Sequence, residues 1–236
     1  MKKYSILLLI DRSGWWARLR HDCPTDAISH VLIFTAIATA AYGSTLGLWH
    51  SPTMMLYTSI KFPLVVIGST FIVTGLNWLL AQLSSSGLQF KQILALTLSA
   101  MALMSWILLA LLPIIVFFLL TSAGTASGKE EIQLAHNSVL LLHVCCIGSA
   151  GTVGVQSLWQ GILELASEQC NHSTLLLGWL ASFAFVGCQL SWMLRPFIGS
   201  PFYPVQFFRA DAFNRNFYEF ILFEVLPFVF TKGGLL

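Results

Sequence analysis

Charged side chains are scarce in this sequence, and their scarcity excludes an ordinary soluble domain. Only 9% of the 236 residues are Asp, Glu, Lys or Arg, whereas soluble domains carry about 25%. Between Asp26 and Arg195 the only charged residues are Lys61, Lys91, Lys129, Glu130, Glu131, Glu164 and Glu168. The long uncharged blocks reach the roughly 20 residues that a helix needs to cross a bilayer. With a mean hydropathy of +0.77, the sequence predicts a polytopic helical membrane protein.

Paired cysteines and enzyme motifs are also missing. The five cysteines include no CxxC pair, which argues against a disulfide framework or a metal-thiolate site. Neither GxSxG nor HExxH occurs, so we predict no enzymatic activity, no catalytic residue and no cofactor. The net charge of +2 is too small to indicate a nucleic-acid partner. The predicted spans hold no Asp or Glu, which counts against a proton-coupled transporter.

Five apolar blocks predict five membrane-spanning helices. The predicted spans are residues 27–49, 61–82, 92–120, 134–160 and 174–195. We expect residues 53–60 to form an interfacial turn, and Pro113 to bend the third span. The sequence therefore predicts an all-α polytopic membrane bundle. Its three parts are an interfacial N-terminal segment (1–26), a bundle of five transmembrane helices (27–195), and an aromatic, proline-rich strap with a short interfacial helix (196–236).

The N-terminal segment mixes aromatic and cationic side chains. Tryptophan suits the headgroup level of a bilayer, and arginine pairs with lipid phosphates. We therefore predict that Trp15, Trp16, Arg18 and Arg20 lie on the membrane surface. The alternative is a solvated leader.

Small residues recur at spacings that let membrane helices approach closely. The first predicted span has them four residues apart, and the fourth has them three residues apart. Such stripes drive helix association in lipid. We predict helix packing at Ala36, Ala40, Gly43, Gly47, Gly148, Gly151 and Gly154.

The closing segment begins where Pro196 stops the last span. Gln189, Trp192 and Arg195 are three residues apart and share one face of the last helical turns. We expect Trp192 at the interface, and Arg195 either at headgroups or on the last helical carbonyls. The following segment is too aromatic for a free tail, so we predict a docked strap that contacts the membrane or a partner through Phe207, Phe208 and Arg209. A helix over residues 213–226, with an Arg215–Glu219 pair, is predicted to follow. The alternative is a disordered tail.

Two stretches resemble a known family. "SIKFPLVV" enters the second predicted span, and "QLSWMLRPFIGSPFYPVQFFR" closes the last one. Together with the five spans they resemble small bacterial members of the Yip1 family. The resemblance implies a membrane-organising, partner-binding protein of the bacterial cytoplasmic (inner) membrane. The eukaryotic members carry a soluble N-terminal region that binds small GTPases, which has no counterpart here. Basic residues before the first span favour an N-terminus on the inside.

Three functions remain open at this point. The first is a non-catalytic subunit or scaffold of a larger membrane assembly, which binds other membrane proteins through its small-residue helix faces and its C-terminal strap, as a homo- or hetero-oligomer within the lipid bilayer. The alternative is a transporter or channel component, with a polar path lined by Asn77, His143, Thr152 and Gln156. The third is a haem- or metal-binding subunit that uses His30, His136 and His143.

Overall fold

The computed structural model describes residues 8–21, 25–122, 128–199 and 204–227, and within these ranges the chain is helical with no β-strand. Five helices, α3 to α7, are long and apolar enough to cross a membrane. The predicted all-α polytopic membrane bundle is thereby confirmed. The elements are α2 (Arg12–His21), α3 (Thr25–Leu48), α4 (Pro52–Leu83), α5 (Phe90–Ser122), α6 (Lys129–Leu165), α7 (His172–Met193), α8 (Phe217–Phe220) and the π-helical η1 (Ile221–Val225).

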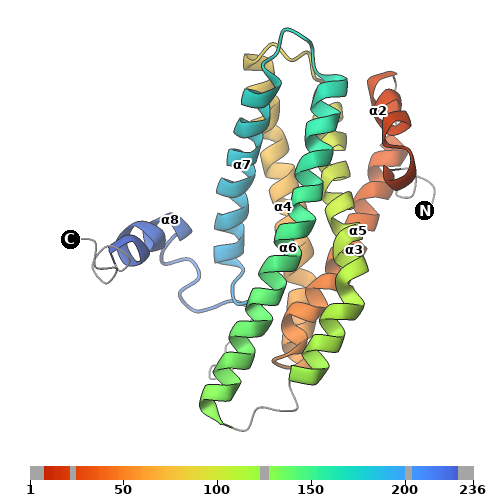
Figure 1. Ribbon diagram of the computed structural model, residues 1–236. Helices are drawn as coiled ribbons and strands as arrows, with labels where there is room; N and C mark the ends of the chain where they lie inside the picture. The colour runs from red at the N-terminus through yellow and green to blue at the C-terminus, as the bar shows by residue number, and fades with distance from the viewer. Residues whose placement is uncertain (1–7, 22–24, 123–127, 200–203, 228–236) are drawn as a thin grey trace.

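The long helices run up and down side by side (Figure 1). Helix α3 packs against α4 and α5, α6 packs against α5, and α7 packs mainly on α4. The short α2 lies at one end of the bundle, and α8 lies beside α7 at the edge of the molecule (Figure 1). Helix α7 is therefore the least enclosed of the five long helices, and the chain after it folds against its outer side.

The second long helix starts earlier than predicted. Residues 53–60, expected as an interfacial turn, are helical. Ser51 caps the helix by accepting the Met54 amide at 3.1 Å, and Pro52 takes a position in the first turn, where it has no amide to leave unpaired. Lys61 therefore lies inside α4, about 14 Å along the helix from its start. Pro113 does not interrupt α5 either, since the helix continues to Ser122.

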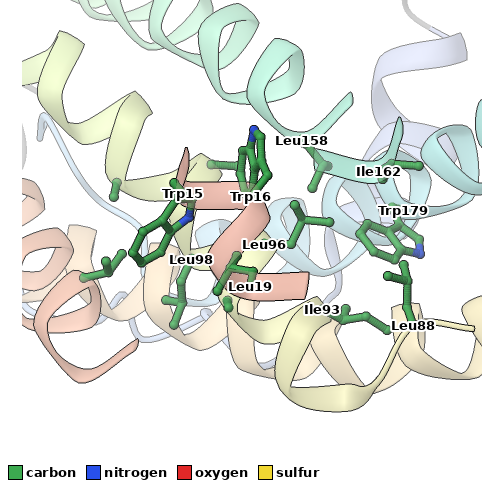
Figure 2. Close-up of a cluster of buried hydrophobic side chains, with 14 of the residues drawn as sticks. Trp15, Trp16, Leu19, Leu88, Ile93, Leu96, Leu98, Leu158, Ile162 and Trp179 are labelled. Atoms are coloured by element: carbon green, nitrogen blue, oxygen red, sulfur yellow. The ribbon is translucent and has the colours of Figure 1, made fainter. Parts of the chain in front are cut away.

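The tryptophans of α2 are buried in the protein, so the prediction that they lie at lipid headgroups is wrong. Trp15 and Trp16 are 1% and 2% exposed, and Figure 2 shows them among leucines of α5 and α6. The Trp15 indole donates to the Ser99 hydroxyl of α5 at 2.9 Å, which removes its need for a partner at the interface. Arg18 and Arg20 are exposed, and Arg20 pairs with Glu164 of α6 at 3.1 Å.

Glycines set the closest helix approaches, but not at every predicted position. A Cβ on Gly43 or Gly47 would lie 2.8 Å or less from α4 atoms, and one on Gly154 would lie 3.3 Å from a carbonyl oxygen of α5. Within this chain no described atom would meet a Cβ on Gly148 or Gly151, so these two glycines set no helix contact inside the chain. Both lie toward the outside of α6, away from its contact with α5. Ala36 and Ala40 are half-buried.

Candidate functional site at the C-terminal strap

Helix α7 stops well before the neighbouring helices do. It ends at Met193, and the C-terminal strap, defined here as residues 196–199 and 204–216, continues beside α4. Gly199 lies within reach of His50 and Met54 at the start of α4. Irregular backbone at membrane depth requires protein partners for its polar groups. The contacts that supply these partners form the candidate site.

Lys61 is the first of these contacts. Its side chain is 0% exposed, and its ammonium donates to the Pro196 carbonyl at 2.8 Å. The same nitrogen lies 4.9 Å from the centre of the Phe207 ring, a cation–π geometry. Helix α4 therefore binds both limbs of the strap through one lysine. No carboxylate in the described part of the chain forms an ion pair with Lys61.

Arg195 is the second contact, at the junction of α7 and the strap. One of its amino groups pairs with Asp211 at 3.1 Å, and the side chain is only 17% exposed. Its guanidinium lies 3.4 Å from the centre of the Trp192 ring. The Nε and Nη1 atoms are buried without a hydrogen-bond partner. Arg195 therefore binds a strap carboxylate that the sequence analysis did not predict, with donor capacity left over.

Asp211 bridges two arginines. Its second oxygen lies 3.0 Å from Arg209 Nε, while the first pairs with Arg195. Desolvation acts to raise the pKa of Asp211, but the charge of Arg209, a hydrogen bond with its own backbone and the pairing with Arg195 together lower it below the ordinary value. The carboxylate is therefore held ionised, and it fixes both guanidinium groups at the strap.

The outer side of α7 binds the segment after the strap. Gln189 accepts the Phe217 amide at 3.1 Å, and the Trp192 indole donates to the Arg215 carbonyl at 2.8 Å. The Tyr218 hydroxyl donates to the Phe185 carbonyl, and these two rings stack at 4.7 Å. The chain thus runs back along α7, and Gln189 and Trp192 both make contacts within the protein.

The helix predicted over residues 213–226 is shorter and starts later. Asn216 and Glu219 form a reciprocal capping box that starts the helix at Phe217. Arg215 pairs with Glu224 and not with Glu219. The carboxylate of Glu219 is occupied by the Asn216 amide at 3.3 Å, which explains why the predicted pair does not form. Phe207 is half-buried against Tyr57, whereas Phe208 and Arg209 are exposed.

Two cavities border the strap. The first, of about 450 Å³, lies between the strap and the start of α4, where His50 and Met54 line it. The second, of about 410 Å³, is named here the arginine pocket. It is lined by Trp192, Arg195, Arg209, Asp211, Asn214, Arg215, Phe220 and Glu224. Three of its eight lining residues are arginines, so the pocket is rich in donors for an anion.

The predicted polar path is not assembled. Asn77 and His143 are buried in α4 and α6, whereas Thr152 and Gln156 are exposed on the outside of α6. His143 Nδ1 lies 3.0 Å from the Tyr42 hydroxyl of α3, while both side-chain polar atoms of Asn77 lack a partner. The four residues face different surroundings because Thr152 and Gln156 point away from the bundle.

The three histidines do not form one metal site. His30 lies at the start of α3, where it contacts the Asp26 carbonyl of its own helix. His136 lies by Trp49, just past the other end of α3. Within the described ranges no group of three His, Cys, Asp or Glu side chains is placed to hold a metal ion. His143 binds Tyr42 and stays inside the core.

Sequence reasoning missed Lys61, Asp211 and Gly161. Lys61 was interpreted as the start of a span, although the residues just before it are helical. The partner of Arg195 was missed because Asp211 is 16 residues away. A Cβ on Gly161 would lie 3.3 Å from the Trp16 ring and closer still to Leu96. A single glycine near a span end was the only signal for that contact.

Comparisons of the chain with protein-family models, with curated proteins and with solved structures found no match.

Proposed function

We propose that this integral membrane protein is a non-catalytic subunit or scaffold that binds another membrane protein through the C-terminal strap and the segment after it. The observation that carries the proposal is the two-sided character of this region. Its inner side is fixed to α4 and α7 by Lys61, Arg195 and Gln189. Its outer side leaves Phe213 and Phe223 at 68% and 73% exposed. Aromatic residues on a fixed backbone are typical of interface anchors.

Purification in mild detergent tests this proposal. We expect the full chain to co-purify with a membrane protein, and the double substitution Phe213→Ser and Phe223→Ser to remove that partner while the monomer still folds. Leu83→Ser is the matched control, because Leu83 is 83% exposed on α4 and lies outside the strap. A wild-type chain that runs alone in several detergents would contradict the proposal, as would equal loss of the partner in the control.

A transporter or channel component is the second candidate, and the buried Lys61 favours it. An ionisable side chain inside a membrane helix marks ion or substrate pathways in many membrane proteins. Reconstitution into liposomes that contain a pH-sensitive dye would test it. Proton flux that Lys61→Met abolishes would favour transport, whereas liposomes as tight as protein-free ones would remove proton transport as the function.

The family and the location belong to the same proposal. The Yip1-like stretches coincide with the two parts of the site: "SIKFPLVV" contains Lys61, and "QLSWMLRPFIGSPFYPVQFFR" contains Arg195 and Phe207. That coincidence supports a Yip1-like protein of the bacterial cytoplasmic membrane, in which these two stretches contact each other. Membrane fractionation of cells that express a tagged chain tests the location.

A further inference from the structure

We propose that the arginine pocket binds a phosphate group that carries one negative charge, as in a phosphodiester. The proposal does not depend on the scaffold function. It depends on the charge of the pocket, on unused donors of Arg195 and on the size and walls of the cavity.

The arginines of the pocket outnumber its carboxylates by one. Its wall carries three arginines and two carboxylates, Asp211 and Glu224. Both carboxylates are already paired: Asp211 with Arg195 and Arg209, and Glu224 with Arg215. One positive charge is left over, and Arg195, which at 17% is the least exposed of the three arginines, is where an uncompensated charge is most costly. A phosphodiester, with its single negative charge, would neutralise the pocket.

Arg195, which lines the pocket, has two donor atoms without an acceptor. Arg195 Nε and Nη1 are buried and have no acceptor within the described chain. A guanidinium is a planar, rigid fork of donors. Nε and Nη1 lie on different edges of this fork, so a phosphate would accept from only one of them, together with the Nη2 that also pairs with Asp211. The Trp192 ring beneath it holds the plane of the fork, and Asp211 holds Arg209 beside it. Leaving charged donors unpaired is unfavourable, so an acceptor in the pocket would stabilise this arrangement.

The walls favour a lipid headgroup as the source of the phosphate. The cavity of about 410 Å³ is larger than a phosphate ion and falls in the range of small-molecule sites. The rings of Trp192 and Phe220, which are 4.8 Å apart, give it an apolar side. Leu222, two residues along the chain from Phe220, is 56% exposed and adds an apolar surface that acyl chains would cover. A soluble phosphate ester shares the charge but would leave these apolar surfaces uncovered.

Ligand-induced thermal shifts of the detergent-purified full chain test the site. The probes are phosphatidylglycerol, diacylglycerol with the same acyl chains, and glycerol 3-phosphate. We expect phosphatidylglycerol to raise the unfolding temperature and diacylglycerol to leave it unchanged. In Arg209→Gln, the concentration of phosphatidylglycerol that gives half-maximal stabilisation should rise at least about tenfold, because a charge-assisted contact is lost. Arg18→Gln, at an exposed arginine of α2, is the matched control and should behave as wild type.

The outcomes separate the two sources of phosphate. Stabilisation by phosphatidylglycerol alone assigns the pocket to a lipid headgroup. Equal stabilisation by glycerol 3-phosphate, also weakened in Arg209→Gln, keeps the phosphate site but assigns it to a soluble ester. The proposal is overturned if diacylglycerol stabilises the chain as well as phosphatidylglycerol does, if Arg209→Gln and Arg18→Gln respond alike, or if no probe shifts the unfolding temperature. None of these outcomes depends on whether a protein partner co-purifies.

Discussion

At the scale of single residues, Lys61 shows how an irregular segment makes a membrane cation tolerable. A carbonyl inside a helix is already bonded to an amide four residues on, whereas the Pro196 carbonyl lies outside α7 and accepts from Lys61 at 2.8 Å. The lysine and the strap therefore satisfy each other. Burial of a charge without such partners would cost several kcal/mol.

Replacement of Lys61 by methionine should release the strap. The apolar stem is kept, but the hydrogen bond and the contact with Phe207 are lost. A hydrogen bond to a charged group contributes about 1.5–3 kcal/mol, so we expect trypsin cleavage after Arg209 and Arg215 to become about tenfold faster. Time courses of digestion in detergent measure this rate. Lys91→Met, at an exposed lysine on α5, should cleave as wild type, and equal rates in the two variants would refute the anchor.

Acid should release the same segment through Asp211. The pKa of this carboxyl is lower in the folded protein than its ordinary 3.8. Its contribution to docking is therefore fully present above the ordinary pKa and is lost as the pH falls below that value toward the lower folded one. We expect the emission of the chain's tryptophans, Trp192 among them, to stay constant from about pH 7 to 5 and to change below about pH 4. Asp211→Asn, which retains Glu224 in the pocket, should lack this transition; an identical transition would assign it to another group.

At the scale of elements, glycine contacts fix the hairpin of α3 and α4. A Cβ on Gly47 would lie 2.4 Å from backbone atoms of Met54, and backbone cannot rotate away. Gly47→Ala should therefore destabilise the bundle by about 1–3 kcal/mol, the usual cost of overpacking. Gly75→Ala is the matched control, since no described atom lies within 4 Å of its Cβ position, and alanine should be neutral or slightly stabilising in a helix. Unfolding in a denaturing detergent compares the two.

The helices were predictable from sequence because each is a long block of apolar residues, which is a local property. The ends of the helices were less predictable. Lys61 was interpreted as the boundary of a span because charge normally marks one, yet its ammonium has a partner 135 residues away. The same limit applied to the contacts of the strap and of α2. The Arg195–Asp211 pair, the Trp192 bond to Arg215 and the Trp15 bond to Ser99 each join segments that are distant in the sequence. Composition indicated that the C-terminal segment would dock, but only the fold shows on what.

At the scale of the whole molecule, the five long helices place α2 and the strap at different parts of the bundle (Figure 1). The loop between α4 and α5 shares the end of α2, whereas the last turn of α5 and the first turn of α6 lie at the opposite end (Figure 1). The basic residues of α2, Arg12, Arg18 and Arg20, favour the inside for its end. With the end of α2 on the inside, the loop between α4 and α5 is predicted to face the inside, and the start of α6 the outside.

Labelling of single cysteines should report this orientation. In a cysteine-free background, Lys129→Cys at the start of α6 should react with an impermeant maleimide on intact cells. Gln89→Cys, exposed beside the start of α5, should react only after the membrane is opened, because the N-terminal side is expected inside. If only Gln89→Cys is labelled on intact cells, the orientation is the opposite of the one predicted.

The position of α2 also has a consequence for synthesis. Arg20 and its partner Glu164 are separated by 144 residues, and the Trp16 ring packs on Gly161 of the same distant helix. At about 5–20 residues per second, the ribosome needs roughly 7–30 s to reach that helix after α2 has been made. During this interval the Trp16 indole lacks its contact with α6, whereas the Ser99 partner of Trp15 on α5 is made earlier. The first helix in the described chain is thus among the last to reach its native contacts.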